Sequence, residues 1–189
     1  LHNLFFSRPE LEGSVHKNTQ FWAEAIHASL KFHGIRQVSY VPDAGHSRLI
    51  DLCRNDEELT TVVLTTEEEG VAMATGAWLG GEKSVLLMQS SGIGNCINMF
   101  SMIRECKIPF FTVITMRGEK DEFNPWQRPL GQNAEKHLEL CGFSVRRIEK
   151  SEETRTIMDH VAEQVFETSS MGAVLISQQM IGIKSFAHE

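Results

Sequence analysis

The chain alternates strictly between short apolar or β-branched runs and segments of helical period, and this order limits its possible folds more than any other feature. The runs with the texture of strands cover residues 37–41, 60–65, 84–89, 109–115, 143–148 and 172–177. The segments between them carry apolar residues at helical spacing. Strands that alternate with helices form parallel sheets joined by right-handed crossovers, with helices on both faces. We therefore expect an α/β fold with a three-layer, doubly wound, six-stranded parallel sheet.

The first helix is expected to start after an N-cap at Asn18 and to stop at Gly34. In residues 1–17 a short apolar patch is interrupted by Arg8, Glu10 and Glu12, before any run as long as a signal peptide requires. We interpret residues 1–17 as a loosely structured leader and residues 18–189 as a single domain. A chain of 189 residues can bury a sizeable core.

Charge and composition exclude several classes of protein. A net charge of -7 argues against a nucleic-acid surface, which needs clustered Lys and Arg. No stretch reaches the roughly 18 apolar residues of a membrane span. The four cysteines show neither CxxC spacing nor a neighbouring His run, so we expect no metal site, no disulfide framework and a cytoplasmic location with reduced thiols.

In doubly wound sheets, ligands bind outside the carboxyl ends of the strands. The loops expected at that edge are "PDAGHS" (42–47), "TEEE" (66–69), "SSGIGN" (90–95) and "MRGEKDEFNPWQRPLGQN" (116–133). The last is the longest and combines two prolines, a Trp, two Arg and several acids, which is typical of a lid or a substrate loop.

Three consecutive acids, Glu67, Glu68 and Glu69, open the helix that follows the second strand. A helix start favours negative charge, and this explanation suffices for Glu68 and Glu69. The segment that follows, "GVAMATGAW" (70–78), consists almost entirely of small residues, which allow another backbone to approach closely.

A Glu nine residues before a Gly, with small apolar residues between, occurs here from Glu67 to Gly76. This pattern resembles the pyrimidine-binding domain of thiamine-diphosphate-dependent 2-oxo acid decarboxylases. The resemblance implies that Glu67 is the catalytic acid that meets N1′ of the cofactor's aminopyrimidine. Donation to that nitrogen requires a carboxyl sheltered from water, since desolvation favours the neutral form.

The segment "MQSSGIGNCIN" (88–98) is similar to a Gln-Asn-Ser-Gly-Leu-Gly-Asn loop in phosphonopyruvate and sulfopyruvate decarboxylases. The similarity implies a cofactor-binding group and a substrate-binding Asn95. The cofactor-binding residues would be Glu67, Gln89, Ser90, Ser91 and Gly92. An alternative is a degenerate dinucleotide loop, but Cys96 stands near where a third glycine belongs and the loop follows the third strand instead of the first.

Two further stretches, "YVPDAGHSRLID" (40–51) and "KIPFFTVITMRGEKDE" (107–122), resemble loops of the same decarboxylases, in the same order. Asp43 either caps the helix that starts near Gly45 or lines the substrate site. His46 is a candidate proton donor, because its ordinary pKa suits neutral pH. Arg117 is either a surface ion-pair partner or the forked cation that holds a sulfonate or phosphonate, with Arg128 as a second candidate.

The sequence contains no Gly-Asp-Gly, the mark of the diphosphate-binding domain in this family. The resemblance therefore implies an alpha-type subunit of a decarboxylase for 3-sulfopyruvate or phosphonopyruvate, a small anionic 2-oxo acid. A beta subunit carrying Gly-Asp-Gly would hold Mg²⁺ and the diphosphate of thiamine diphosphate, in a hetero-oligomer built on two copies of each subunit. The alternatives are a decarboxylase or carboligase subunit for another 2-oxo acid and a non-catalytic nucleotide-binding module.

Overall fold

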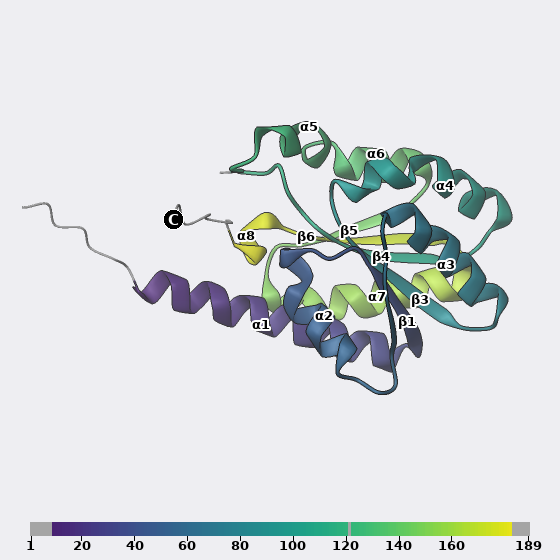
Figure 1. Ribbon diagram of the computed structural model, residues 1–189, viewed down its shortest axis with the longest axis horizontal. Coiled ribbons are helices and arrows are strands. Elements are labelled where there is room, and N and C mark those ends of the chain that lie inside the picture. Colours follow the sequence, from purple (N-terminus) through teal and green to yellow (C-terminus); the bar gives the residue numbers. More distant parts are fainter. Residues whose placement is uncertain (1–8, 121, 183–189) are drawn as a thin grey trace, which may run out of the picture.

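The computed structural model describes residues 9–120 and 122–182, and it shows one six-stranded sheet with helices on both faces (Figure 1). The strands lie in the order β2-β1-β3-β4-β6-β5 and every pairing is parallel. Their bounds are β1 Ile35–Tyr40, β2 Thr60–Val63, β3 Lys83–Gln89, β4 Phe110–Thr115, β5 Ser144–Ile148 and β6 Met171–Ile176. The expected doubly wound six-stranded sheet is confirmed.

Helices form the two outer layers. On one face lie α1 (Pro9–Phe32), α2 (Ser47–Arg54) and α7 (Thr154–Thr168), and on the other lie α3 (Glu67–Leu79), α4 (Gly92–Cys106) and α6 (Ala134–Cys141) (Figure 1). The shorter elements are η1 (Ala44–His46), η2 (Pro125–Gln127), α5 (Arg128–Gly131), η3 (Ser151–Glu153) and α8 (Gln178–Ile181). None of the helices in the described part of the chain has the length and apolar character needed to cross a membrane.

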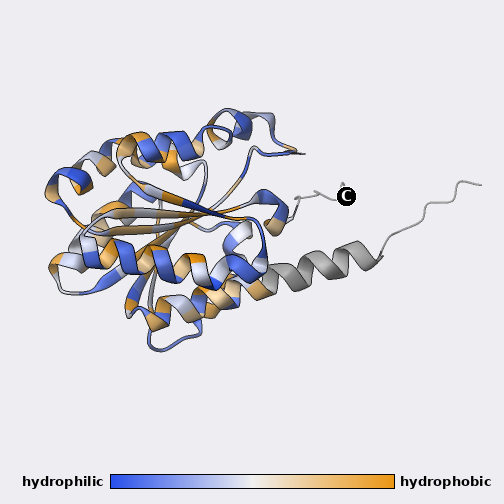
Figure 2. Ribbon diagram, turned by 180° about the vertical axis from the view of Figure 1, so that it is seen from behind, coloured by the Kyte–Doolittle hydropathy of each residue, from blue (hydrophilic) through white to orange (hydrophobic). Residues whose placement is uncertain are grey.

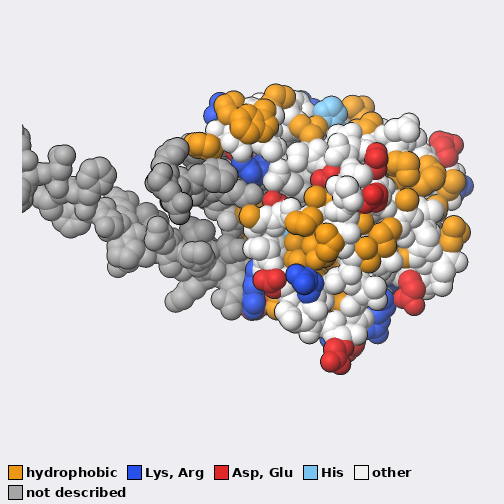
Figure 3. Space-filling view, viewed as in Figure 1, with side chains coloured by type: hydrophobic (Ala, Val, Ile, Leu, Met, Phe, Trp, Pro, Cys, Tyr) orange, Lys and Arg blue, Asp and Glu red, His pale blue; other side chains and the backbone are white. Residues whose placement is uncertain are grey.

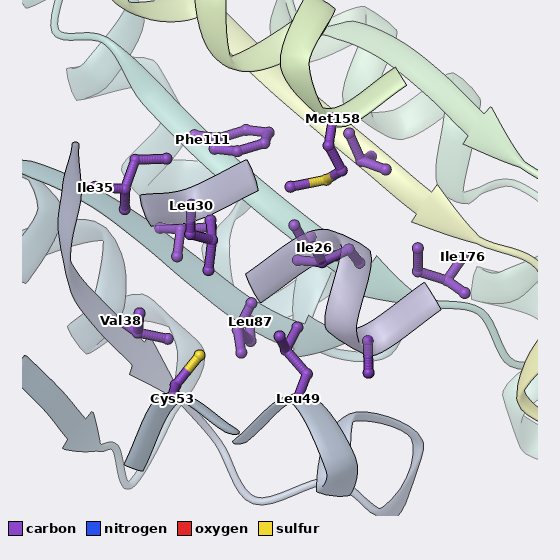
Figure 4. Packing of buried hydrophobic residues seen from close by; sticks show 14 of the residues in the cluster. Ile26, Leu30, Ile35, Val38, Leu49, Cys53, Leu87, Phe111, Met158 and Ile176 are labelled. Carbon is purple, nitrogen blue, oxygen red and sulfur yellow. The ribbon is translucent and has the colours of Figure 1, made fainter. Parts of the chain in front are cut away.

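The sheet separates two hydrophobic cores, because successive residues of a strand point to opposite faces. Leu87 and Phe111 face the α1 side, where they pack with Ile26 and Leu30 (Figure 4). Their neighbours Leu86 and Phe110 join the other core, beneath α3, α4 and α6. Polar residues cover much of the outer sides of the helices (Figure 2). This layering fixes the strand ends that carry the site.

Helix α1 begins earlier than the sequence indicated. It starts at Pro9, so the expected N-cap at Asn18 was wrong and residues 9–17 of the expected leader are helical. Proline suits the first turn of a helix, since its φ angle is already helical and its missing N–H would have had no partner there. Residues 1–8 of the expected leader lie outside the described residues.

Candidate active site at the carboxyl edge of the sheet

The topological switch point of the sheet lies at the carboxyl ends of β1 and β3. The two strands are neighbours in the sheet, but their following connections lead to opposite faces, to α2 and to α4. Ligands of doubly wound sheets bind at such a switch point. Side chains from the loops after β1, β2, β3 and β4 meet around it in this protein.

Glu67 is the first residue of α3 and is only 8% exposed. Its Oε2 accepts a hydrogen bond of 2.7 Å from Nδ2 of Asn95. Gly92 lies directly against the carboxyl group: a methyl group in place of its hydrogen would be 2.5 Å from Cγ of Glu67 and 2.7 Å from Oε1. The first turn of α4 therefore forms one wall around this acid.

The other two acids of the same turn behave differently. Glu68 is exposed, and Glu69 uses Oε2 to accept the backbone N–H of Thr65 at 2.8 Å. Glu69 thus satisfies a backbone donor next to the helix start, as a capping acid does. Of the three consecutive carboxylates, only Glu67 is held in the interior.

Asp43 lies at the centre of a polar cluster that joins three strand ends. Its carboxylate accepts hydrogen bonds from Gly45 N (3.1 Å), Gln89 Nε2 (3.0 Å) and Thr115 Oγ1 (2.7 Å). It therefore caps η1 and also ties the loop after β1 to the last residues of β3 and β4. These contacts orient the amide of Gln89.

Gln89 continues the cluster toward the surface. Its Oε1 accepts hydrogen bonds from Ser91 Oγ (3.0 Å) and from Gln127 Nε2 (3.1 Å). Ser90 points the other way: it is buried and its hydroxyl oxygen accepts the backbone N–H of Arg117 at 3.0 Å. Ser91 is exposed. Gln89 and Ser91 are thus hydrogen-bonded to each other on the side of the loop that reaches toward the surface.

His46 is fully buried beneath the edge. Its Nδ1 lies 3.5 Å from Thr115 Oγ1 and 3.9 Å from an oxygen of Asp43, and its ring meets Trp22 edge-on. Among the described residues, its Nε2 has no hydrogen-bond partner. Burial lowers the pKa of His46 to about 4, an effect that the nearby Asp43 charge partly opposes. His46 is therefore a neutral interior side chain at pH 7.

Arg117 follows β4 and is 7% exposed. Its guanidinium group forms a bidentate pair with Glu122, whose carboxylate also accepts the N–H of Gly118 (3.0 Å) and Nε2 of Gln178 (2.8 Å). This pairing raises the pKa of Arg117 and holds the pKa of Glu122 far below its ordinary value. Arg128 donates to the Glu122 carbonyl oxygen at 3.0 Å.

Two glycines close the base of the long segment after β4. A methyl group on Gly131 would lie 1.9 Å from the carbonyl oxygen of Arg117, and one on Gly118 would lie 2.3 Å from that of Gln127. Gly118 also has a φ of +78°, which strains other residues. The described residues between them form a closed loop. Phe123 and Trp126 on this loop are 58% and 72% exposed.

Glu122, Gln127 and Thr115 belong to the site but were not predicted from the sequence. An acid five residues after a strand-end Arg could have suggested the Arg117–Glu122 pair. Gln127 gives no such signal, because it is an ordinary polar residue in a loop. Thr115 reads as one more β-branched residue of a buried strand.

The fold is that of a doubly wound α/β domain with its polar edge at the β1/β3 switch point. Among solved structures, it is similar to 2-oxoglutarate:ferredoxin oxidoreductase from Magnetococcus marinus, with a TM-score of 0.67 and 13% identity over 85% of this chain and 29% of that one. At this identity the likeness shows the fold alone.

Three curated relatives define the family more closely. Sulfopyruvate decarboxylase subunit alpha of Methanococcus maripaludis is 38% identical over 62% of this chain and 71% of its own length. The subunit of the same name from Methanocaldococcus jannaschii is 33% identical over 80% of this chain and 90% of its own length. Phosphonopyruvate decarboxylase of Streptomyces viridochromogenes is 35% identical over 60% of this chain but 29% of its own length. No family model matches the chain. The chain belongs to the family of sulfopyruvate decarboxylase alpha subunits.

Proposed function

We propose that the chain is the alpha subunit of a decarboxylase that converts 3-sulfopyruvate to sulfoacetaldehyde and CO₂ with thiamine diphosphate, or phosphonopyruvate to the corresponding aldehyde. Membership of the family supports the reaction class. The single observation that carries the mechanism is the position of Glu67, a buried carboxyl at the switch point. Thiamine diphosphate, when bound, supplies the electron sink for loss of CO₂.

The residues around Glu67 fit the pyrimidine end of that cofactor. Oε2 of Glu67 is occupied by Asn95, while no hydrogen bond from the described residues reaches Oε1. We propose that Oε1 of Glu67 shares a proton with the ring nitrogen N1′. Gly92 has no side chain, so only backbone lies against this side of the carboxyl, and the exposed Ser91 precedes it in the loop. Gln89 would lie alongside them, and Ser90 would act through the loop it braces.

For the substrate we propose Arg117 as the principal cation. Glu122 occupies Nε and Nη2, so a sulfonate or phosphonate would meet the remaining edge of the guanidinium group. We propose that Asp43 contributes by holding Gln89, and that the fully buried His46 contributes by supporting the edge from beneath. Either tetrahedral anion suits the same cation, so the choice between the two substrates is left to the assay.

We further propose a beta subunit that carries Gly-Asp-Gly and holds Mg²⁺ and the diphosphate, in a cytoplasmic hetero-oligomer. The relatives' names, which include the word subunit, support a partner. Helix α3 exposes the small residues Ala72 and Gly76, and Leu79 and Ile97 are exposed on α3 and α4. Hydrophobic side chains reach the surface in several patches in Figure 3. Such a surface suits close contact between helices.

The contact between Gly92 and Glu67 favours this function over a nucleotide-binding module. A phosphate bound by the loop after β3 would have to sit at the first turn of α4, where the Glu67 carboxyl group already lies. The carboxyl group takes up the space that the phosphate would need at this turn. The same contact is suited to a neutral, nitrogen-containing ring.

The test is CO₂ release by the chain co-purified with a Gly-Asp-Gly subunit, with 3-sulfopyruvate, phosphonopyruvate and pyruvate as substrates. Glu67→Gln should lower kcat by roughly 100-fold or more, since a positioned proton carrier contributes about that much. Glu68→Gln is the matched control, because Glu68 is the next residue and is exposed. Equal activity of the Glu67→Gln variant and the wild type would exclude the proposed role. Full activity of the chain without a partner would exclude the shared site.

A further inference from the structure

We infer that Asn95 is a positioning residue for Glu67 and not a substrate ligand: its amide determines which oxygen of Glu67 carries the shared proton. This inference rests on the proposed function. The inference extends the proposed function by naming the group that orients the Glu67 carboxyl.

The local geometry places two residues of α4 on the same carboxyl group. Gly92 and Asn95 are three residues apart in the first turn, so they lie on one face of the helix. Any side chain on Gly92 would meet Cγ, Cδ and Oε1 of Glu67, and Asn95 donates to Oε2 at 2.7 Å. The carboxyl group is thus fixed by backbone on one side and by an amide on the other.

The chemistry of the amide makes the two oxygens of Glu67 different. The NH₂ group of an asparagine can only donate, so an oxygen that receives its hydrogen bond cannot direct a proton of its own along that line. A proton on Glu67 is therefore favoured on Oε1. That is the oxygen with no hydrogen bond from the described residues, and the one we propose to face the cofactor.

No other side chain in the described part of the chain donates to Glu67. Cys96, the next residue after Asn95, is buried. Burial is the main cause that raises the pKa of its thiol to about 12, and the charges of Glu67 and Glu68 add to the effect. Cys96 therefore brings no charge to the site. Without the Asn95 amide, only the close packing of Gly92 would limit the orientation of the Glu67 carboxyl group.

The first experiment observes the hydrogen bond directly and requires neither cofactor nor activity. In the ¹⁵N-labelled full chain, the side-chain NH₂ signals of Asn95 are identified by their absence in Asn95→Ala. We expect Glu67→Ala to shift these signals and Glu68→Ala to leave them in place. Signals that do not respond to Glu67→Ala would overturn the inference.

The second experiment measures kinetics in the complex with the beta subunit. Asn95→Ala should lower kcat by roughly tenfold, the effect of losing a hydrogen bond to a charged group, while the KM for 3-sulfopyruvate changes by less than about twofold. In the Glu67→Gln background the same change should have no further effect, since both act through one carboxyl group. Asn98→Ala, an exposed position one turn further along α4, is the matched control.

The outcomes separate the inference from the proposed function. A rise in KM that is independent of Glu67 would make Asn95 a substrate ligand and overturn the inference. A complex that decarboxylates none of the three acids would refute the proposed function, and the NMR result would still decide whether Asn95 orients Glu67. Alanine favours helix at an exposed position, so Asn95→Ala should fold, as a thermal melt can verify.

Discussion

The guanidinium group of Arg117 binds the carboxylate of Glu122 through two hydrogen bonds, Nε to Oε2 at 2.8 Å and Nη2 to Oε1 at 2.5 Å, and both side chains are buried. The pair joins the end of β4 to the middle of the loop that follows it. Because the same carboxylate accepts the N–H groups of Gly118 and Asn124, it also sets the path of that loop.

Replacement of Glu122 by Gln should destabilise the protein by roughly 3–5 kcal/mol, because it leaves the buried Arg117 charge without its partner. Urea unfolding at pH 7 measures the change. Glu139→Gln, an exposed position on α6, should change the free energy of unfolding by less than about 0.5 kcal/mol. A loss below about 1 kcal/mol in Glu122→Gln would mean that the pair is solvated in solution.

The contribution of Glu122 to the free energy of unfolding should also depend on pH. Its pKa in the folded protein lies far below the ordinary value of 4.5, so the stabilisation is complete above 4.5 and is lost as the pH falls through the folded value. The stability difference between the wild type and Glu122→Gln should therefore be smaller at pH 3 than at pH 7. Unfolding by urea at both values tests this, and a constant difference would contradict it.

His46 should produce a second pH dependence, in a higher range. Its pKa falls from an ordinary 6.5 to about 4 in the folded protein, so only the unfolded chain gains its proton between these values. Stability should be complete above pH 6.5 and decrease by up to roughly 3 kcal/mol as the pH falls to about 4. His46→Asn should remove this part of the profile. His160→Asn, an exposed position on α7, should retain it.

Gly92→Ala should impair catalysis more than folding. The added methyl group would lie 2.5 Å from Cγ of Glu67, so the acid must move from its contact with Asn95. We expect kcat to decrease at least roughly tenfold, in line with the sensitivity of catalysis to small displacements. Gly76→Ala on α3, where nothing lies within 4 Å of the new methyl group, should instead stabilise the chain by about 1 kcal/mol. A kcat of Gly92→Ala equal to that of the wild type would contradict the contact.

Arg117→Lys should change substrate preference. A lysine cannot offer a planar fork to Glu122 and a free edge to a tetrahedral anion at the same time. The ratio of kcat/KM for 3-sulfopyruvate to that for pyruvate should fall, and a ratio of two substrates is unaffected by the amount of folded enzyme. An unchanged ratio would make Arg117 purely structural.

The sequence was sufficient to predict the sheet. Strands such as β4 and β6, in which every residue is buried, appear as runs of apolar and β-branched residues, and the expected bounds differ from the observed ones by one or two residues. Edge strand β2 is shorter than expected, ending at Val63, because Leu64 and Thr65 already turn toward α3. Periodicity reports burial, so it works best where burial is complete.

The site was predictable only in part. Glu67 could be placed at the correct helix start, but its contact with Asn95 joins residues 28 positions apart and leaves no periodic trace. The burial of His46 was not predictable either, since a histidine in a Gly-containing loop suggests solvent exposure. The partner of Arg117 lies in an irregular segment, where no repeat relates one residue to another.

The paired glycines at the base of the loop after β4 have a consequence for how this protein can diverge. Since the close backbone contact at Gly118 and Gly131 fixes the two ends, the exposed side chains of Phe123 and Trp126 can change without altering the base of the loop. New surface chemistry could thus arise at these two exposed positions, whereas a side chain at either glycine would collide with the opposite backbone.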